Sequence, residues 1–273
     1  MTIDFHTHIF PDRIADRAVS ALAESGHVRP FLDGRELSLS QSARRAGFAL
    51  SVVLPVVTKP SQHASVLRFA REVNSRTGET GLCSFGGIHP AEEDPEEKLD
   101  EMVRLGFRGI KLHPVFQGVA ADDARTLRVL RAAYERDLIV TIHAGRDISF
   151  PGNDLADADR LARMMDRVPP KKLILAHMGG WGMWKEAARL LGTRGLYLDT
   201  AFCLKPGDAD FLSPGEFVRM ARTHGTDRVL FGTDSPWDSQ RAAADLIGAA
   251  PLTAEEKEKI LYANAARLLG LQD

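Results

Sequence analysis

Short apolar segments alternate with amphipathic stretches along the whole chain, and this alternation constrains the fold more than any other feature of the sequence. Each segment is a brief apolar run bounded by Gly, Pro or polar residues, as expected for a strand buried in a parallel sheet. The eight predicted strands are Ile3–His8, Ala49–Pro55, Leu82–His89, Phe107–His113, Leu138–His143, Lys172–His177, Leu196–Thr200 and Arg228–Asp234.

Helical patterns with one apolar face fill the intervals between these strands. Pro95 and the two Glu residues after it favour a first helical turn, and Gly106 favours the end of the same helix. The predicted helices are Asp12–Glu24, Ser61–Arg76, Pro95–Leu105, Asp122–Arg136, Asp154–Val168, Trp181–Leu191, Ser213–His224, Asp238–Ala249 and Ala254–Leu269. A strand followed by a helix eight times predicts a closed (β/α)8 barrel.

The length of the chain agrees with this fold. It has 273 residues, and a (β/α)8 barrel typically needs about 250, so we predict one α/β domain, a TIM barrel, over residues 1–273. The alternative is an open doubly wound sheet, which would favour a glycine-rich phosphate-binding turn after the first strand. The residues at that position, His6–Pro11, include no glycine.

Composition and charge exclude several functional classes. Lys and Arg total 35 against 37 Asp and Glu, a net charge of -2, so no basic excess favours nucleic acid or an anionic membrane as a partner. The longest strongly apolar run, Phe48–Val57, is far shorter than the ~20 residues of a membrane span. With two cysteines, Cys83 and Cys203, and no secretory signal pattern, a cytoplasmic location is expected. We expect a small-molecule substrate, and a homodimer is the default oligomer.

Six of the nine histidines lie at the C-terminal ends of predicted strands, where barrel enzymes build their active sites. His6 and His8 are two residues apart, so they project from one face of the same strand and can reach one cation. Asp234 ends the eighth strand. Imidazole and carboxylate groups bind zinc and related divalent ions, so the pattern predicts a metal site. The six histidines are His6, His8, His89, His113, His143 and His177.

The strand order resembles that of the amidohydrolase superfamily, which has His-x-His on the first strand, His on the fifth and sixth, and Asp on the eighth. Local motifs resemble its amidohydrolase-related branch, which includes metal-dependent decarboxylases similar to aminocarboxymuconate semialdehyde decarboxylase. The matching site residues are His6, His8, His143, His177 and Asp234, and the matching motifs are Ile3–His8, Gly109–Pro114, Leu175–Gly180 and Phe231–Pro236.

The resemblance implies a divalent metal cofactor, zinc by default, with manganese or iron as alternatives. One ion is usual in this branch, whereas other superfamily members hold two ions bridged by a carbamylated Lys on the fourth strand. Lys111 lies on the fourth predicted strand, on the same face as His113. It is therefore either such a bridge or a group that binds an anionic substrate or pairs with an acid. His113 and His89 are further candidate metal or substrate ligands.

The resemblance also implies a role for each matching residue. We expect His6, His8 and His143 to anchor the ion, while Asp234 contacts the ion and the attacking water and moves its proton to the leaving group. His177 either completes the ligand set or steadies the water and the developing oxyanion. The candidate substrate contacts are Arg146, for a carboxylate, and the aromatic side chains of Phe116 and Trp237.

These assignments predict a metal-dependent hydrolase that uses a metal-activated water on a small carbonyl, amide or lactone substrate bearing a carboxylate. The alternative is a metal-dependent non-oxidative decarboxylase, a carboxy-lyase, because both reactions use the same ligands. A third interpretation is a barrel that binds a metal without catalysis, since a fold by itself does not establish an activity.

Overall fold

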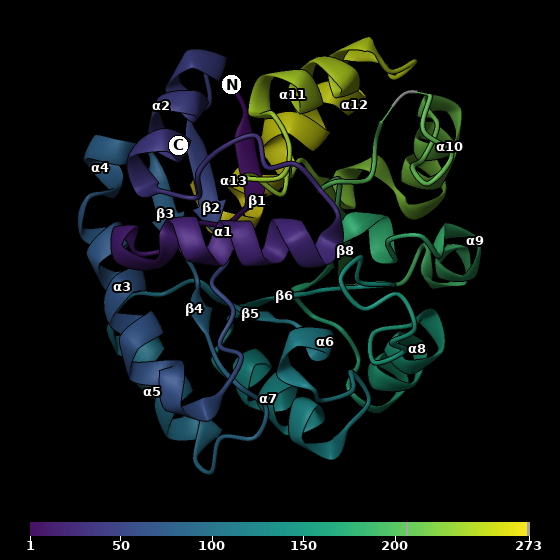
Figure 1. Cartoon of the computed structure of the whole chain (residues 1–273). Helices are drawn as coiled ribbons and strands as arrows, with labels where there is room; N and C mark the ends of the chain where they lie inside the picture. Colours follow the sequence, from purple (N-terminus) through teal and green to yellow (C-terminus); the bar gives the residue numbers. More distant parts are fainter. Residues whose placement is uncertain (206, 272–273) are drawn as a thin grey trace. The chain divides into compact units, whose positions relative to one another are not determined.

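The computed structural model describes residues 1–205 and 207–271, and its chain divides into two compact units. The first unit comprises Met1–Val53, Val73–Cys83 and Leu198–Asp273, and the second comprises Leu54–Glu72 and Ser84–Tyr197. Each unit combines parallel strands with helices (Figure 1). The single domain expected over residues 1–273 stays a prediction.

The first unit is built around strand β1. Its elements are β1 (Ile3–Thr7), α1 (Asp12–Gly26), α2 (Glu36–Ala46), β2 (Leu50–Val53), α4 (Thr77–Thr80), α10 (Pro214–His224), a 3-10 turn (Thr226–Arg228), β9 (Val229–Leu230), α11 (Gln240–Ala249), α12 (Ala254–Glu258), a π-helical segment (Lys259–Ala263) and α13 (Asn264–Leu269). Helix α13, in yellow, packs beside β1, in purple (Figure 1). Three elements continue across the unit boundaries along the chain: α3 (His63–Ser75), β3 (Leu82–Ser84) and β8 (Leu196–Asp199).

Strand β1 has neighbours on both sides within the first unit. On one side it pairs in parallel with β2, in the register Ile3 with Leu50. On the other side the Phe5 N–H donates to the Phe231 carbonyl over 2.8 Å, so the segment that follows β9 lies against β1. A barrel requires this pairing of the first strand with the last strand, whereas an open sheet leaves its edges unpaired.

The second unit contains four consecutive parallel strands. Its elements are a 3-10 turn (Pro60–Gln62), β4 (Gly86–Gly87), α5 (Pro95–Arg104), β5 (Gly109–Leu112), α6 (Pro114–Gln117), α7 (Ala124–Glu135), β6 (Ile139–Ile142), α8 (Ala158–Arg167), β7 (Leu173–Leu175), 3-10 turns at His177–Gly179 and Ala188–Leu190, and α9 (Trp184–Ala187). Parallel pairing joins four strands in the order β4, β5, β6 and β7. Their C-terminal ends therefore lie at the same edge of the sheet.

The predicted strands appear close to their expected positions, with one exception. The segment Leu82–His89 is interrupted at Phe85 and gives two short strands, β3 and β4. Close packing explains the two glycines of β4: a Cβ on Gly86 would lie 2.6 Å from the sulfur of Met102, and one on Gly87 would lie 2.9 Å from the Pro55 carbonyl oxygen. At Gly87 a side chain would collide with backbone, whereas at Gly86 the flexible end of Met102 would have to move, so the requirement for glycine is stricter at Gly87.

Three helices, α2, α4 and α6, lie outside the predicted set. Helix α2 carries three Ser residues in its interior, which weakens the helical signal, but Leu39 and Ala43 give it a buried face. It ends at Gly47, whose φ of 76° suits a glycine. In the part of the chain that the structure describes, no helix has the length and apolar character needed to cross a lipid bilayer.

Candidate metal centre

Three candidate ligands of the first unit converge at the C-terminal end of β1. Their ligand atoms form a triangle: His6 Nε2 and His8 Nε2 are 3.2 Å apart, His8 Nε2 and Asp234 Oδ1 are 3.1 Å apart, and His6 Nε2 and Asp234 Oδ1 are 3.5 Å apart. Bonds of about 2.0–2.2 Å from one ion to each atom would give edges of about this length. We call His6, His8 and Asp234 the first cluster. Its geometry fits one divalent ion.

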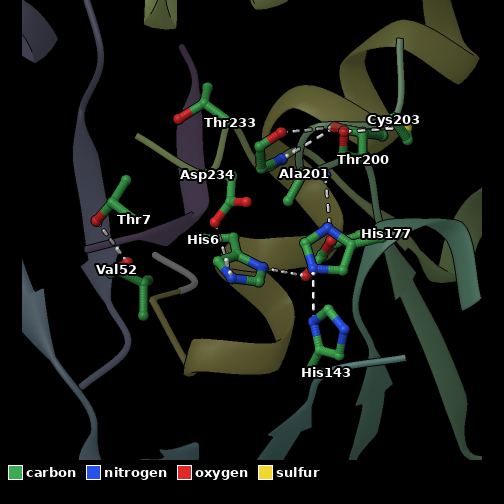
Figure 2. A network of polar contacts seen from close by, with 12 residues as sticks. His6, Thr7, Val52, His143, His177, Thr200, Ala201, Cys203, Thr233 and Asp234 are labelled. Atoms are coloured by element: carbon green, nitrogen blue, oxygen red, sulfur yellow. Dashed lines mark hydrogen bonds and ion pairs between the residues drawn. The ribbon is translucent and has the colours of Figure 1, made fainter. Parts of the chain in front are cut away.

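The backbone presents Asp234 to the two imidazoles in a strained conformation. Its φ is 63°, in the left-handed region that costs a non-glycine residue about 1–3 kcal/mol. The Asp234 N–H donates to the His6 carbonyl over 2.8 Å, and its own carbonyl accepts the Trp237 N–H over 3.0 Å. Figure 2 shows the Asp234 carboxyl pointing toward the His6 ring. The fold therefore holds this carboxyl in place at the expense of local strain.

Asp4 secures the segment that carries Asp234. Its carboxyl is fully buried and accepts hydrogen bonds from the Thr233 hydroxyl at 2.7 Å, the Thr233 N–H at 3.0 Å and the Gln240 side-chain amide at 2.9 Å. Burial raises the pKa of Asp4 to about 7, against the lowering effect of these hydrogen bonds. Asp4 thus fastens β1 to the residue directly before Asp234.

Asp199, which the sequence analysis did not single out, contacts the ring nitrogen of His6 that does not face the other ligands of the first cluster. It ends β8, and its Oδ2 lies 2.8 Å from Nδ1 of His6, with both side chains almost completely buried. The one sequence feature that could have indicated Asp199 is its position as an acidic residue at the C-terminal end of an apolar strand. The strand pattern alone does not show which imidazole such a carboxylate supports.

In the second unit, His143 and His177 lie together at the ends of β6 and β7. His143 Nδ1 is 3.1 Å from His177 Nε2 (Figure 2), and His143 Nε2 is 3.2 Å from the Arg146 carbonyl oxygen. A carbonyl can only accept, so His143 Nε2 carries the proton and Nδ1 keeps its lone pair. His143 is therefore able to bind a cation through Nδ1. Together with His113 and Asp147 these residues form what we call the second cluster.

His113 and Asp147 lie close enough to His143 to suggest a second metal site, but their hydrogen bonds favour another role. His113 Nδ1 accepts the Phe116 N–H over 3.4 Å, so its proton is on Nε2, which points to Asp147 Oδ2 at 3.5 Å. A nitrogen that carries a proton does not bind a metal. The His113 ring stacks on the His143 ring with centroids 4.2 Å apart and an angle of 12°. His113 thus supports the ring of His143.

Two further candidates, His89 and Lys111, are buried near strand ends of the second unit. Both nitrogens of His89 are engaged by backbone groups: Nδ1 accepts the Ala91 N–H over 3.0 Å, and Nε2 lies 3.1 Å from the Gln117 carbonyl oxygen. This satisfied ring favours a structural role. Lys111 is 1% exposed on β5, opposite Thr141 of β6. Its role as a bridge or as an anion-binding group stays a prediction.

The candidate substrate contacts occupy the loops after the strands. Arg146 is exposed, whereas Phe116 and Trp237 are half-buried. Phe116 contacts the His113 ring, with centroids 4.3 Å apart, and meets the exposed Phe150 edge to face at 5.9 Å. The structure thus brings together His6, His8 and Asp234 in one unit and the predicted partners His143 and His177 in the other. That all five share one ion stays a prediction.

Comparison with known proteins adds the family. The model of the family described as Amidohydrolase matches residues 3–271. The chain belongs to the amidohydrolase family. The match covers nearly the whole chain, and it confirms the resemblance inferred from the five site residues and the local motifs. No curated protein sequence matches the chain.

Solved structures similar to this amidohydrolase confirm the α/β, (β/α)8 barrel fold class. An uncharacterized Tim-barrel protein from Bordetella bronchiseptica is 20% identical, with a TM-score of 0.76 over 98% of each chain. A dihydroxybenzoic acid decarboxylase from Polaromonas sp. JS666, with bound manganese, is 17% identical, with a TM-score of 0.72 over 99% of this chain and 97% of its own. A 5-carboxyvanillate decarboxylase from Sphingomonas paucimobilis is 18% identical, with a TM-score of 0.67 over 98% of each chain.

Proposed function

We propose that this amidohydrolase-family protein is a metal-dependent non-oxidative decarboxylase that acts on a hydroxylated aromatic carboxylic acid. The observation that carries the proposal is the first cluster, in which His6, His8 and Asp234 converge with edges of 3.1 to 3.5 Å. The decarboxylases among the similar structures favour a lyase over the hydrolase that the sequence analysis placed first. Their bound manganese makes Mn²⁺ the first ion to test and Zn²⁺ the second.

In this proposal His6, His8 and Asp234 hold the metal. A bound divalent ion would draw electron density from a substrate oxygen and so stabilise the charge that develops when the carbon–carbon bond breaks. The chain's own residues orient the substrate and manage the proton. His6 lies in β1 and His8 directly follows its last residue, Thr7, so the strand fixes the positions of both imidazoles.

We assign the proton transfer to Asp234. One carboxyl oxygen, Oδ1, faces the imidazoles, and the other is assigned to the substrate. A proton passes from Asp234 to the ring carbon that bears the carboxylate, and a carbon–hydrogen bond forms. The carbon–carbon bond then breaks, its electron pair stays with the ring, and carbon dioxide leaves. Asp234 regains a proton from water, so the net change is replacement of the carboxylate by hydrogen.

Cationic and aromatic side chains that suit such a substrate occur in each of the two units. Arg146 and Lys111 are the cations proposed to bind a carboxylate, and Arg146 is exposed, three residues after His143 in the chain. Phe116, Phe150 and Trp237 offer aromatic faces for a planar ring. The hydrolase alternative would use the same residues with water as the attacking group and would need no proton on carbon.

The reaction itself separates the two functions. The Mn²⁺-loaded protein is incubated with 2,6-dihydroxybenzoate and with 5-carboxyvanillate in ¹⁸O-water and, separately, in D₂O. A decarboxylase releases carbon dioxide, places deuterium on the carbon that lost it, and adds no ¹⁸O to the organic product. Neither acid contains an amide, ester or lactone bond, so a lactone of a hydroxylated aromatic acid is tested as well: incorporation of ¹⁸O into the acid formed, without release of carbon dioxide, would establish the hydrolase instead. Absence of product from all three substrates with metal bound would overturn the proposed substrate class.

A further inference from the structure

We propose that Asp199 is a positioning residue that fixes His6 in the one tautomer able to bind a metal. The inference rests on the proposed metal centre and adds a residue that neither the family resemblance nor the sequence analysis assigned. Asp199 Oδ2 lies 2.8 Å from His6 Nδ1, and the side chains of Asp199 and His6 are 0% and 1% exposed. A carboxylate only accepts, so the proton of the neutral ring is on Nδ1 and the lone pair on Nε2.

The lone pair that this bond exposes points into the first cluster. Nε2 of His6 is the atom that lies 3.2 Å from His8 Nε2 and 3.5 Å from Asp234 Oδ1. With the opposite tautomer, a hydrogen would occupy the space where an ion has to bind. Asp199 therefore determines whether His6 Nε2 carries a lone pair that can bind the ion or a hydrogen that prevents binding. It does so through Nδ1, without contacting a ligand atom of the cluster.

The carboxylate of Asp199 is held by its strand and by a second hydrogen bond. Asp199 pairs with Leu230 of β9 in the parallel register, and its Oδ1 accepts the Ala201 N–H over 3.1 Å. The two oxygens thus serve two different donors, one on the backbone and one on the imidazole. Burial, and then repulsion from the Asp199 charge, raise the pKa of the neighbouring Cys203 thiol, which stays protonated.

The backbone at His6 is also closely packed, which fixes the start of its side chain. A Cβ on Gly232 would lie 2.8 Å from the Cβ of His6, which shows how closely the backbone of the last strand approaches this residue. The Thr200 hydroxyl bonds to the backbone of Gly232 at 3.0 Å in both directions and holds the two segments together. The backbone that carries His6 is therefore held close to the backbone of Gly232.

These contacts make Asp199→Asn an informative substitution, because the two side chains have the same shape. An amide has one accepting oxygen and one donating nitrogen, whereas Asp199 accepts at both positions. Either the Ala201 N–H or the His6 Nδ1–H must then face an NH₂ group. If the imidazole changes tautomer, its proton moves to Nε2 and prevents the ion from binding. If the tautomer stays the same, the loss of the negative charge still makes Nε2 a weaker electron donor to the ion.

The first test is Mn²⁺ binding, measured from the electron paramagnetic resonance of the free ion. The D199N variant should bind Mn²⁺ about 10–100-fold more weakly than the wild type, as outer partners of ligating histidines typically do. Asp245→Asn is the matched control, because it removes the same charge from the same unit at an exposed pair with Arg241, and it should bind as the wild type does. Equal affinity of D199N and wild type would overturn the proposal.

The second test needs no substitution of Asp199 and is independent of its effect on folding. Long-range ¹H–¹⁵N correlations of the metal-free wild type report the tautomer of each histidine, and the His6 signals are identified by their loss in His6→Gln. The Nδ1–H pattern at His6 supports the proposal, and the Nε2–H pattern refutes it. Neither test measures turnover, so a failure of the decarboxylase proposal would leave both results as they stand.

Discussion

The two histidine clusters have the same kind of side chain and opposite hydrogen-bond surroundings. In the first cluster, a carboxylate behind His6 takes the Nδ1 proton and leaves the Nε2 lone pair directed at the other ligands. In the second cluster, His113 uses Nδ1 to accept a backbone N–H and presents Nε2–H to Asp147. A carboxylate close to an imidazole is therefore not enough to mark a metal site. The deciding feature is which nitrogen the surroundings leave without a proton.

The substitution with the largest expected effect is Asp234→Asn in the first cluster. An amide cannot carry the proton to the substrate carbon, so we expect the rate of carbon dioxide release to fall by about 10³-fold, within the range for loss of a general acid. The thermal midpoint of the metal-free protein should change little, because the side chain is only partly buried and keeps its shape. Release of carbon dioxide at near the wild-type rate would remove Asp234 from the chemistry.

The contrast between the clusters is tested most directly by His8→Gln and His113→Gln. Loss of His8 removes a ligand, and we expect Mn²⁺ affinity to fall by at least about 100-fold, beyond the usual effect of an outer partner. Loss of His113 removes no ligand. It removes a stacking contact with His143, worth about 0.5–1.5 kcal/mol, and the ring's bonds to Phe116 and Asp147, so affinity should change by less than about tenfold. Titration calorimetry with Mn²⁺ compares the two variants. A larger effect at His113 would reverse our assignment of the clusters.

The position of the first cluster could be predicted from the sequence because strand geometry determines it. Alternation that continues from β1 into the next residue places His6 and His8 on one face, and the segment that follows β9 brings Asp234 to them. The supporting residues could not be predicted in the same way. Asp199 and Asp147 act through one particular nitrogen of a ring from another strand, and no spacing in the sequence specifies that nitrogen.

The fold shows the same division between what periodicity reveals and what it does not. The segments with a clear apolar period, such as α5 and α7, occur within two residues of their predicted bounds. Helix α6 was missed because it is a single turn, capped by the His113 ring and without room for a period. The last predicted helix, Ala254–Leu269, contains a π-helical segment at Lys259–Ala263. A change in hydrogen-bond register leaves the composition of a helix unaltered, so the sequence does not reveal it.

Asp147→Asn measures what the second cluster contributes if it is structural. The carboxyl of Asp147 accepts the Ser149 N–H over 2.8 Å and faces His113, and it is almost completely buried. We expect a loss of about 1–2 kcal/mol in the free energy of unfolding, since a buried donor loses its acceptor. For a chain of this length that lowers the thermal midpoint by about 2–8 °C. Mn²⁺ affinity should stay within about threefold of wild type, because Asp147 contacts His113, which is not a metal ligand in this proposal, and so it lacks the effect of an outer partner. A large loss of affinity would instead make Asp147 a ligand.

The smallest expected effect concerns His63, a buried imidazole outside both clusters. Burial, and then the nearby Lys98 ammonium, lower the pKa of His63 below its ordinary value of 6.5. Below pH 6.5 the unfolded chain therefore binds a proton that the folded chain resists, so stability should decrease as the pH falls from 6.5 toward the folded pKa, and it should be fully present above 6.5. His63→Gln removes this group. Urea unfolding at several pH values between 7.5 and 5 should show a shallower decrease for the variant than for the wild type. Parallel curves would mean that His63 is equally easy to protonate in both states, so that burial alone does not determine how an imidazole of this protein behaves.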